Sequence, residues 1–368
     1  MGLGLQTIWA RLGRNVVGNL TTVSTSARDF TTLILGYYFA ERVANEAPGD
    51  GDLAVFLRWE QLAAYARGGV NGDWDFRGVE RAKKNWNREG KLRLGTDSAS
   101  QILSNQKTYG LWGLYTVPAR TSGLVEGEPT RLTPAGRSVV ERLYLPVWTK
   151  EGFKNADAVV ARLSKPRTDL DSNRGDRTFV NATAKVLSKR LSAAEREVYR
   201  AHLLLGGPND RTSGGQPVLA RAMESTFDDP DWTLSPARVR HLAKQCRAAG
   251  ERGAAVADRL ERIRTAELLL APTAALFDLI LGSEGQTVAE VAGVVKRQWG
   301  TSVRSMDLIE TTKVEGELVD ATGDPDTGRR WVKLAHSLAS GDYEGAVKLL
   351  LEVFGQDGVR NVSHDLSA

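Results

Sequence analysis

Two arginine–histidine pairs have the residue types of an acid–base site. Arg196 stands six positions before His202, and Arg330 stands six positions before His336. A guanidinium group can neutralise a phosphate while a nearby imidazole takes up or donates a proton. Both pairs lie in segments that we predict to be helical, so phosphodiester cleavage is the reaction that the sequence offers. In a chain with 35 arginines, two such pairs are close to the number expected by chance.

Other catalytic patterns are missing from the sequence. It has no Gly-x4-Gly-Lys-Ser/Thr phosphate loop, and its four histidines show neither a His-Glu-x-x-His pattern nor any Cys/His ligand spacing. The single cysteine, Cys246, cannot form an intrachain disulfide and fits a reducing cytoplasm. We therefore expect no catalytic residues, no cofactor and no metal. Phosphodiester cleavage stays open as the alternative.

A cluster of cations in the middle of the chain points to binding. Between positions 77 and 93, seven basic residues stand against two acidic ones. Four of the basic residues recur at spacings of four, three and four, which aligns them on one face of a helix predicted over 75–89. Such a stripe neutralises phosphates and makes binding depend on salt. The predicted phosphate contacts are Arg77, Arg81, Lys83, Lys84, Arg88, Lys91 and Arg93.

Residues 123–137 read as two short strands around an acidic turn, followed by the start of a helix. Thr133 has the hydroxyl of an N-cap, and Pro134 occupies the first helical position, where a missing N–H costs nothing. This is the pattern of a wing, and the segment before a wing, here 100–114, reads bases in winged helices, although Gly110 and Gly113 weaken a helix there. The predicted contacts from that segment and the wing are Ser104, Asn105, Gln106, Lys107, Arg120 and Arg131.

Three resemblances extend these predictions. Residues 132–137, Leu-Thr-Pro-Ala-Gly-Arg, resemble the end of the wing in MarR-like and PadR-like winged-helix proteins, which implies duplex DNA as the partner. Residues 3–6, 20–22, 28–30, 330–334 and 340–343 are similar to uncharacterised bacterial proteins of antiviral-defence loci, which implies that setting and no catalytic residue. The two arginine–histidine pairs resemble the Arg-x4-6-His motif of HEPN ribonucleases, which implies RNA cleavage.

The chain divides into four parts by pattern. We predict an N-terminal helical segment over 1–48, a winged-helix domain over 49–146, an exposed connector over 147–177 and a helical interaction domain over 178–368. The connector contains Pro166 and Gly175 among charged residues, and a helix break is expected at Pro272. The predicted fold class is mainly α: a winged helix-turn-helix domain with a small β-wing, and an all-helical C-terminal domain.

The amino-acid composition limits the classes of protein to which the chain can belong. With 41% apolar and 26% charged residues, the sequence is that of a soluble globular protein. The apolar run at 33–40 is too short to span a membrane, so we expect a cytoplasmic protein without a membrane partner. We expect a non-enzymatic subunit or regulator of a bacterial defence complex that binds duplex DNA and holds protein subunits through its C-terminal domain. The alternatives are a HEPN-like effector ribonuclease and an architectural subunit whose winged helix binds protein.

Overall fold

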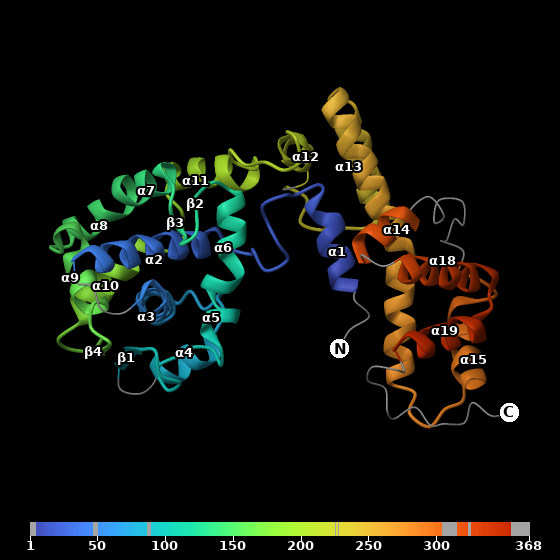
Figure 1. Ribbon diagram of the computed structural model, residues 1–368, viewed down its shortest axis with the longest axis horizontal. Coiled ribbons are helices and arrows are strands. Elements are labelled where there is room, and N and C mark those ends of the chain that lie inside the picture. Colours follow the sequence, from blue (N-terminus) through green and yellow to red (C-terminus); the bar gives the residue numbers. More distant parts are fainter. Residues whose placement is uncertain are drawn as a thin grey trace. The chain divides into compact units, whose positions relative to one another are not determined.

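The computed structural model describes residues 5–46, 51–86, 90–224, 226, 228–303, 315–322 and 325–354. These residues belong to two compact units (Figure 1). Unit 2 is Gly18–Arg211, and unit 1 combines Met1–Val17 with Thr212–Ala368. The described part of the chain is mainly helical, as predicted.

Unit 2 is built around one long helix whose apolar run, residues 33–40, is buried on all sides. The rings of Phe39, Trp59 and Trp148 pack against one another in its core, with centroids 4.9–6.0 Å apart. This apolar run is too short to span a membrane, and it forms the central helix of the core. The elements of unit 2 are α2 (Ala27–Glu46), α3 (Asp52–Tyr65), the π-helix η1 (Ala66–Val70), α4 (Val79–Trp86), β1 (Lys91–Gly95), α5 (Gln106–Tyr109), α6 (Leu111–Thr121), β2 (Val125–Glu126), β3 (Arg131–Leu132), α7 (Pro134–Val139), η2 (Val140–Tyr144), α8 (Leu145–Lys150), η3 (Lys154–Ala156), α9 (Asp157–Leu163), β4 (Arg167–Asp171), α10 (Arg177–Val186), α11 (Ala193–Tyr199) and η4 (Arg200–Leu204).

Helices are the only regular secondary structure among the described residues of unit 1. Its helix α14 runs without a break through Pro272, so the predicted break is wrong. Leu269, Leu270 and Leu276 on both sides of the proline are buried in one core, and this packing outweighs the lost hydrogen bond. The elements are α1 (Leu5–Arg14), α12 (Gly215–Glu224), α13 (Pro236–Arg247), α14 (Glu251–Leu281), α15 (Val288–Trp299), α17 (Glu315–Thr322), α18 (Pro325–Ser340) and α19 (Tyr343–Phe354).

The segment 147–177 differs from the exposed connector that the sequence predicted. Its strand β4 pairs antiparallel with β1, with Lys91 opposite Asp171 and Leu92 opposite Leu170, and the two leucines are buried. A five-residue strand with alternating burial attaches this segment to the core of unit 2. The boundary between the units therefore lies at 211/212 rather than near 178.

The N-terminal segment predicted over 1–48 is divided between the units. Ile8 and Leu12 of α1 are buried in the core formed by α14 and the helices after it, whereas α2 belongs to unit 2. The apolar face of α1 needs a partner surface, and the C-terminal helices supply it. Unit 1 is therefore made from the two ends of the described chain.

Residues 125–132 form the predicted hairpin, but only two residues of each strand are paired. Val125 pairs with Leu132 and Glu126 with Arg131, so each strand has two residues. The predicted helix start is confirmed: the Thr133 hydroxyl accepts a hydrogen bond from the Gly136 N–H at 3.0 Å, and Pro134 occupies the first helical position. We call residues 123–132 the wing segment. Strand β1 pairs with β4 and adds no third strand to it.

Candidate nucleic-acid interface

Four predicted contacts are exposed on α4 and on the turn before it. Arg77 lies in the turn, and Arg81, Lys83 and Lys84 lie on the helix. We call these four residues the α4 patch. The helix begins at Val79, later than predicted. Arg88 lies outside the described residues.

The charges of the α4 patch are barely compensated. The only acidic residue from 77 to 86 is Glu80. Arg77, Arg81 and Lys84 have no ion-pair partner among the residues that the structure describes. Lys83 Nζ lies 5.6 Å from the centroid of the Trp74 ring, a cation–π contact that leaves its charge in place. The patch is therefore free to bind anions.

Helix α4 packs against η1 at Gly69, and Trp74, in the segment before α4, packs against Gly68. A Cβ atom on Gly68 would lie 2.3 Å from the Trp74 ring, and one on Gly69 would lie 2.2 Å from the Trp86 ring, so only glycine fits at either position. Ala82 of α4 is fully buried on the same side. This packing holds the opposite side of the helix, which carries the patch, toward solvent.

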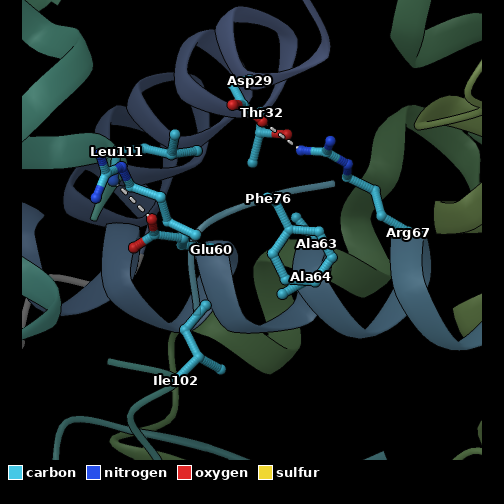
Figure 2. A pocket seen from close by; sticks show the side chains of 10 residues that line it. Asp29, Thr32, Glu60, Ala63, Ala64, Arg67, Phe76, Ile102 and Leu111 are labelled. Atoms are coloured by element: carbon cyan, nitrogen blue, oxygen red, sulfur yellow. Dashed lines mark hydrogen bonds and ion pairs between the residues drawn. The ribbon is translucent and has the colours of Figure 1, made fainter. Parts of the chain in front are cut away.

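The turn that leads into α4 is fixed by a buried arginine. Arg67 Nη1 lies 2.5 Å from Asp29 Oδ1, Arg67 Nε lies 2.9 Å from Asp73 Oδ2, and Nη2 donates to the Asp75 carbonyl at 3.1 Å. Figure 2 shows Arg67 of η1 and Asp29 of α2 directed toward each other beside Phe76. Burial raises the pKa of Asp29 although Arg67 opposes this rise. The ion pairs connect α2 and η1 to the residues just before Arg77.

A second buried carboxylate, Glu60, holds the start of α6. It accepts hydrogen bonds from the Leu111 N–H at 2.7 Å and from Gln106 Nε2 at 2.8 Å. The N-cap residue of α6 is Gly110, which has no side chain for capping, so Glu60 supplies the acceptor from α3. Burial raises the pKa of Glu60 to about 7.

The pocket that Glu60 and Arg67 line (Figure 2) is small. Its volume is about 10 Å³, which accommodates one water molecule. Neither Glu60 nor Arg67 is among the site residues predicted from the sequence. The signal that could have found them is a charged residue inside an otherwise apolar helical stretch, which must have a partner if it is buried. We assign both residues a positioning role.

The predicted contacts on β1 are paired across the ribbon. Arg93 Nε lies 3.0 Å from Asp169 Oδ1 on β4, and Lys91 stands directly opposite Asp171. Cross-strand pairs of opposite charge stabilise such a ribbon, although exposed pairs contribute little. Arg93 is thus a weaker candidate for a phosphate contact than the residues of the α4 patch.

The segment predicted to read bases forms a short helix, α5, preceded by turns. Ser104 and Lys107 are exposed, and Asn105 caps α5 by accepting a hydrogen bond from the Thr108 N–H at 3.0 Å. Gln106 is fully buried, so its predicted contact with bases is wrong. Its amide donates to the Leu57 carbonyl and to Glu60, and its Oε1 accepts from Gln61.

Two predicted cations, Arg120 of α6 and Arg131 of β3, hold the wing segment in place. Arg120 Nη2 donates to the Gly127 carbonyl at 3.2 Å and to Thr130 Oγ1 at 2.7 Å, and Arg131 pairs with Asp52 at 2.5 Å. The exposed tip of the hairpin carries Glu126 and Glu128. Two carboxylates there repel phosphates, so the wing segment is poorly suited to the contact predicted for it.

The candidate contacts fall into separate places within unit 2. In Figure 1, α4 lies beyond the end of α6 that joins α5, whereas β2 and β3 lie beside the opposite end of α6. The α4 patch and the wing segment therefore form no continuous basic face. The α4 patch remains as the candidate interface.

The arginine–histidine pairs lie in different units. In unit 2, Arg196 Nη1 donates to the Leu191 carbonyl at 2.8 Å, and His202 Nδ1 lies 2.8 Å from the Ser122 carbonyl. Both side chains are thus engaged with backbone oxygens. In unit 1, Arg330 and His336 are exposed on α18. Arg196 and His202 thus bond to separate backbone carbonyls instead of to each other in the described structure.

Every helix among the described residues is too short or too polar to span a membrane. Among them, no group of three or more His, Cys, Asp or Glu side chains is placed to hold a metal ion. Comparison of the chain with protein-family models, with curated proteins and with solved structures found no match.

Proposed function

We propose that this protein is a non-enzymatic subunit or regulator that binds duplex DNA through the α4 patch. The observation that carries the proposal is the contrast in charge compensation. Arg77, Arg81 and Lys84 are exposed without ion-pair partners in the described structure, whereas Arg93, Arg120 and Arg131 are engaged. A duplex carries closely spaced phosphates, and exposed cations on a rigid helix match that charge.

The winged-helix reading of residues 49–146 is part of this proposal. The order of the elements α3, α4, α6, β2 and β3 supports a winged helix. The pairing of β1 with β4 differs from the winged-helix pattern, because β1 does not join the wing. Helix α6, in the position before the wing, exposes Gly113 and Val117 and has Arg120 as its only cation. Such a face offers no hydrogen bonds to base edges, so binding is expected to depend little on DNA sequence.

The test replaces the three unpaired cations with glutamine. The R77Q/R81Q/K84Q variant should bind a mixed-sequence duplex more weakly, and its plot of log affinity against log salt should lose up to about three units of slope. Fluorescence anisotropy over a salt series measures both quantities. The matched control is K150Q/K165Q/K189Q, which removes three exposed lysines of unit 2 that have no ion-pair partner in the described structure.

Two results contradict the proposal. One is an absence of binding by the unaltered protein at low salt, and the other is an equal loss in the variant and in the lysine control. Equal losses would mean that the response reflects net charge and that α4 has no special role.

The architectural alternative has one observation in its favour, the acidic tip formed by Glu126 and Glu128. Under that reading the wing segment contacts a basic surface of a protein subunit, with the helices of unit 1 holding others in a bacterial defence complex. Glu126→Gln with Glu128→Gln would then release a partner that copurifies with the protein, and DNA binding would be unchanged.

The ribonuclease alternative makes a separate prediction. Purified protein would cleave RNA without added metal, and His202→Ala or His336→Ala would abolish the cleavage. The binding proposal expects no cleavage in either case.

A further inference from the structure

One side of α6 is apolar and exposed. Leu111 and Tyr115 are buried in the core of unit 2, whereas Gly113 and Val117 lie one turn apart on the opposite side of the helix. Val117 is 57% exposed, and Tyr109, at the end of α5, is 53% exposed. We call Tyr109, Gly113 and Val117 the α6 face. Exposed apolar side chains that share a surface are typical of contacts with protein.

The C-terminal end of the α6 face adjoins the acidic tip of the wing segment. Arg120 lies three residues after Val117, on the same side of the helix, and donates to the Gly127 carbonyl at 3.2 Å. Gly127 stands between Glu126 and Glu128, which are exposed and have no ion-pair partner in the described structure. This end of the face therefore carries uncompensated negative charge.

The N-terminal end of the α6 face adjoins cations. Arg77 lines the small pocket of Figure 2 together with Leu111, the first residue of α6. Lys107 on α5 is exposed two residues before Tyr109. Neither cation has an ion-pair partner among the described residues. The α6 face thus has positive charge at one end, negative charge at the other and apolar side chains between them.

We propose that the α6 face binds a second copy of this chain, with the two α6 helices packed antiparallel across a two-fold axis near Gly113. This axis places Val117 of each copy against Tyr109 of the other, and the acidic tip of each copy against Arg77 and Lys107 of the other. A surface with opposite charges at its two ends is complementary to itself in this orientation, and that charge complementarity selects a second copy over an unrelated partner.

The first experiment tests the apolar contact. Sedimentation equilibrium of the unaltered protein, freed of nucleic acid, should show a reversible dimer at concentrations up to about 0.1 mM. Val117→Glu places a carboxylate in the apolar part of the contact in each copy, and it should raise the dimer dissociation constant by at least about tenfold. Leu281→Glu, which alters a leucine of α14 that is 53% exposed, is the matched control and should leave the constant unchanged.

The second experiment tests the orientation. E126K/E128K makes both ends of the α6 face basic, and R77E/K107E makes both ends acidic, so each variant alone should dimerise about tenfold more weakly. An equimolar mixture should regain the affinity of the unaltered protein, because every basic end then meets an acidic end in the mixed dimer. Recovery in the mixture also demonstrates that both variants are folded.

Four results overturn the dimer proposal. They are a monomer at all concentrations, a dimer that Val117→Glu leaves intact, equal weakening by Val117→Glu and Leu281→Glu, and a mixture that associates no better than its components. The inference goes beyond the proposed function and does not depend on it. Because the measurements contain no nucleic acid, these results leave the DNA proposal standing, and an absence of duplex binding leaves the dimer proposal standing.

Discussion

The interior of unit 2 and the surface of α4 both contain arginine, in opposite surroundings. Arg28, Arg58 and Arg67 are each at most 3% exposed, and they bind carboxylates or backbone carbonyls. Arg77 and Arg81 are exposed and have no ion-pair partner in the described structure. The interior arginines connect segments distant in sequence: Arg58 Nη2, for example, donates to the Leu163 carbonyl at 2.7 Å.

This difference shows what an arginine-rich composition means here. A buried guanidinium is costly unless its charge and donors find partners, so each of these three acts as a structural crosslink, although Arg28 Nε and Nη2 have no hydrogen-bond partner in the described structure. An exposed one costs nothing to leave unpaired and can meet a phosphate. The number of arginines therefore does not indicate binding, and the environment of each one does.

The largest loss of folding stability should come from a substitution in the interior of unit 2. Arg67→Met leaves Asp29 and Asp73 buried without their counter-ion, and we expect the free energy of unfolding to fall by about 3–5 kcal/mol. Arg81→Met, the same change on the α4 patch, should alter it by no more than about 0.5 kcal/mol. Urea denaturation followed by circular dichroism measures both values. Similar losses in the two variants would remove the distinction between the regions.

A smaller effect concerns Glu60 and pH. Its pKa is about 7 in the folded protein and 4.5 ordinarily, so between these values the folded state binds the additional proton. The contribution of Glu60 to the free energy of unfolding should therefore fall by roughly 3 kcal/mol as pH rises from about 4.5 to 7, and should change no further above 7.

Glu60→Gln removes this titration. The difference in free energy of unfolding between the unaltered protein and this variant should follow the predicted fall, measured by urea denaturation at several pH values. Glu80→Gln, on the exposed surface of α4, is the control and should show no such trend. A pH profile that Glu60→Gln leaves unaltered would show that Glu60 is not the group responsible.

The smallest effect is expected at the wing segment. Arg131 and Asp52 are 40% and 23% exposed, so Arg131→Gln should cost less than about 1 kcal/mol of folding stability. It should also leave the salt dependence of DNA binding unchanged. A loss of about one unit of slope would mean that Arg131 contacts a phosphate, and the wing segment would then join the α4 patch.

Local signals in the sequence were sufficient for several helix starts. Thr133 caps α7 as expected, and Ser192 with Glu195 forms a capping box at the start of α11. Asp342 accepts a hydrogen bond from the Gly345 N–H at 2.9 Å at the start of α19. These interactions join residues three positions apart, so the sequence contains all the information that they need.

Interactions between distant residues could not be predicted in this way. Strand β4 looked like a connector because Pro166 and Gly175 flank it, and its partner β1 lies more than 70 residues earlier. Gln106 looked like a base contact because its amide is polar, but Glu60 and Leu57 from α3 enclose it. For the candidate site, the sequence indicated which residues are cationic, and only the fold shows which are already paired.

Unit 1 combines residues 1–17 with residues 212–368, and this affects how it folds during translation. Helix α1 is translated before unit 2, but its partners α14 and α17 are translated about 250 residues later, which takes on the order of 10–50 s at typical elongation rates. Unit 2 can fold on the ribosome during this interval. The apolar side chains Ile8 and Leu12 meanwhile have no core to enter, so α1 stays exposed until α14 and α17 have been translated.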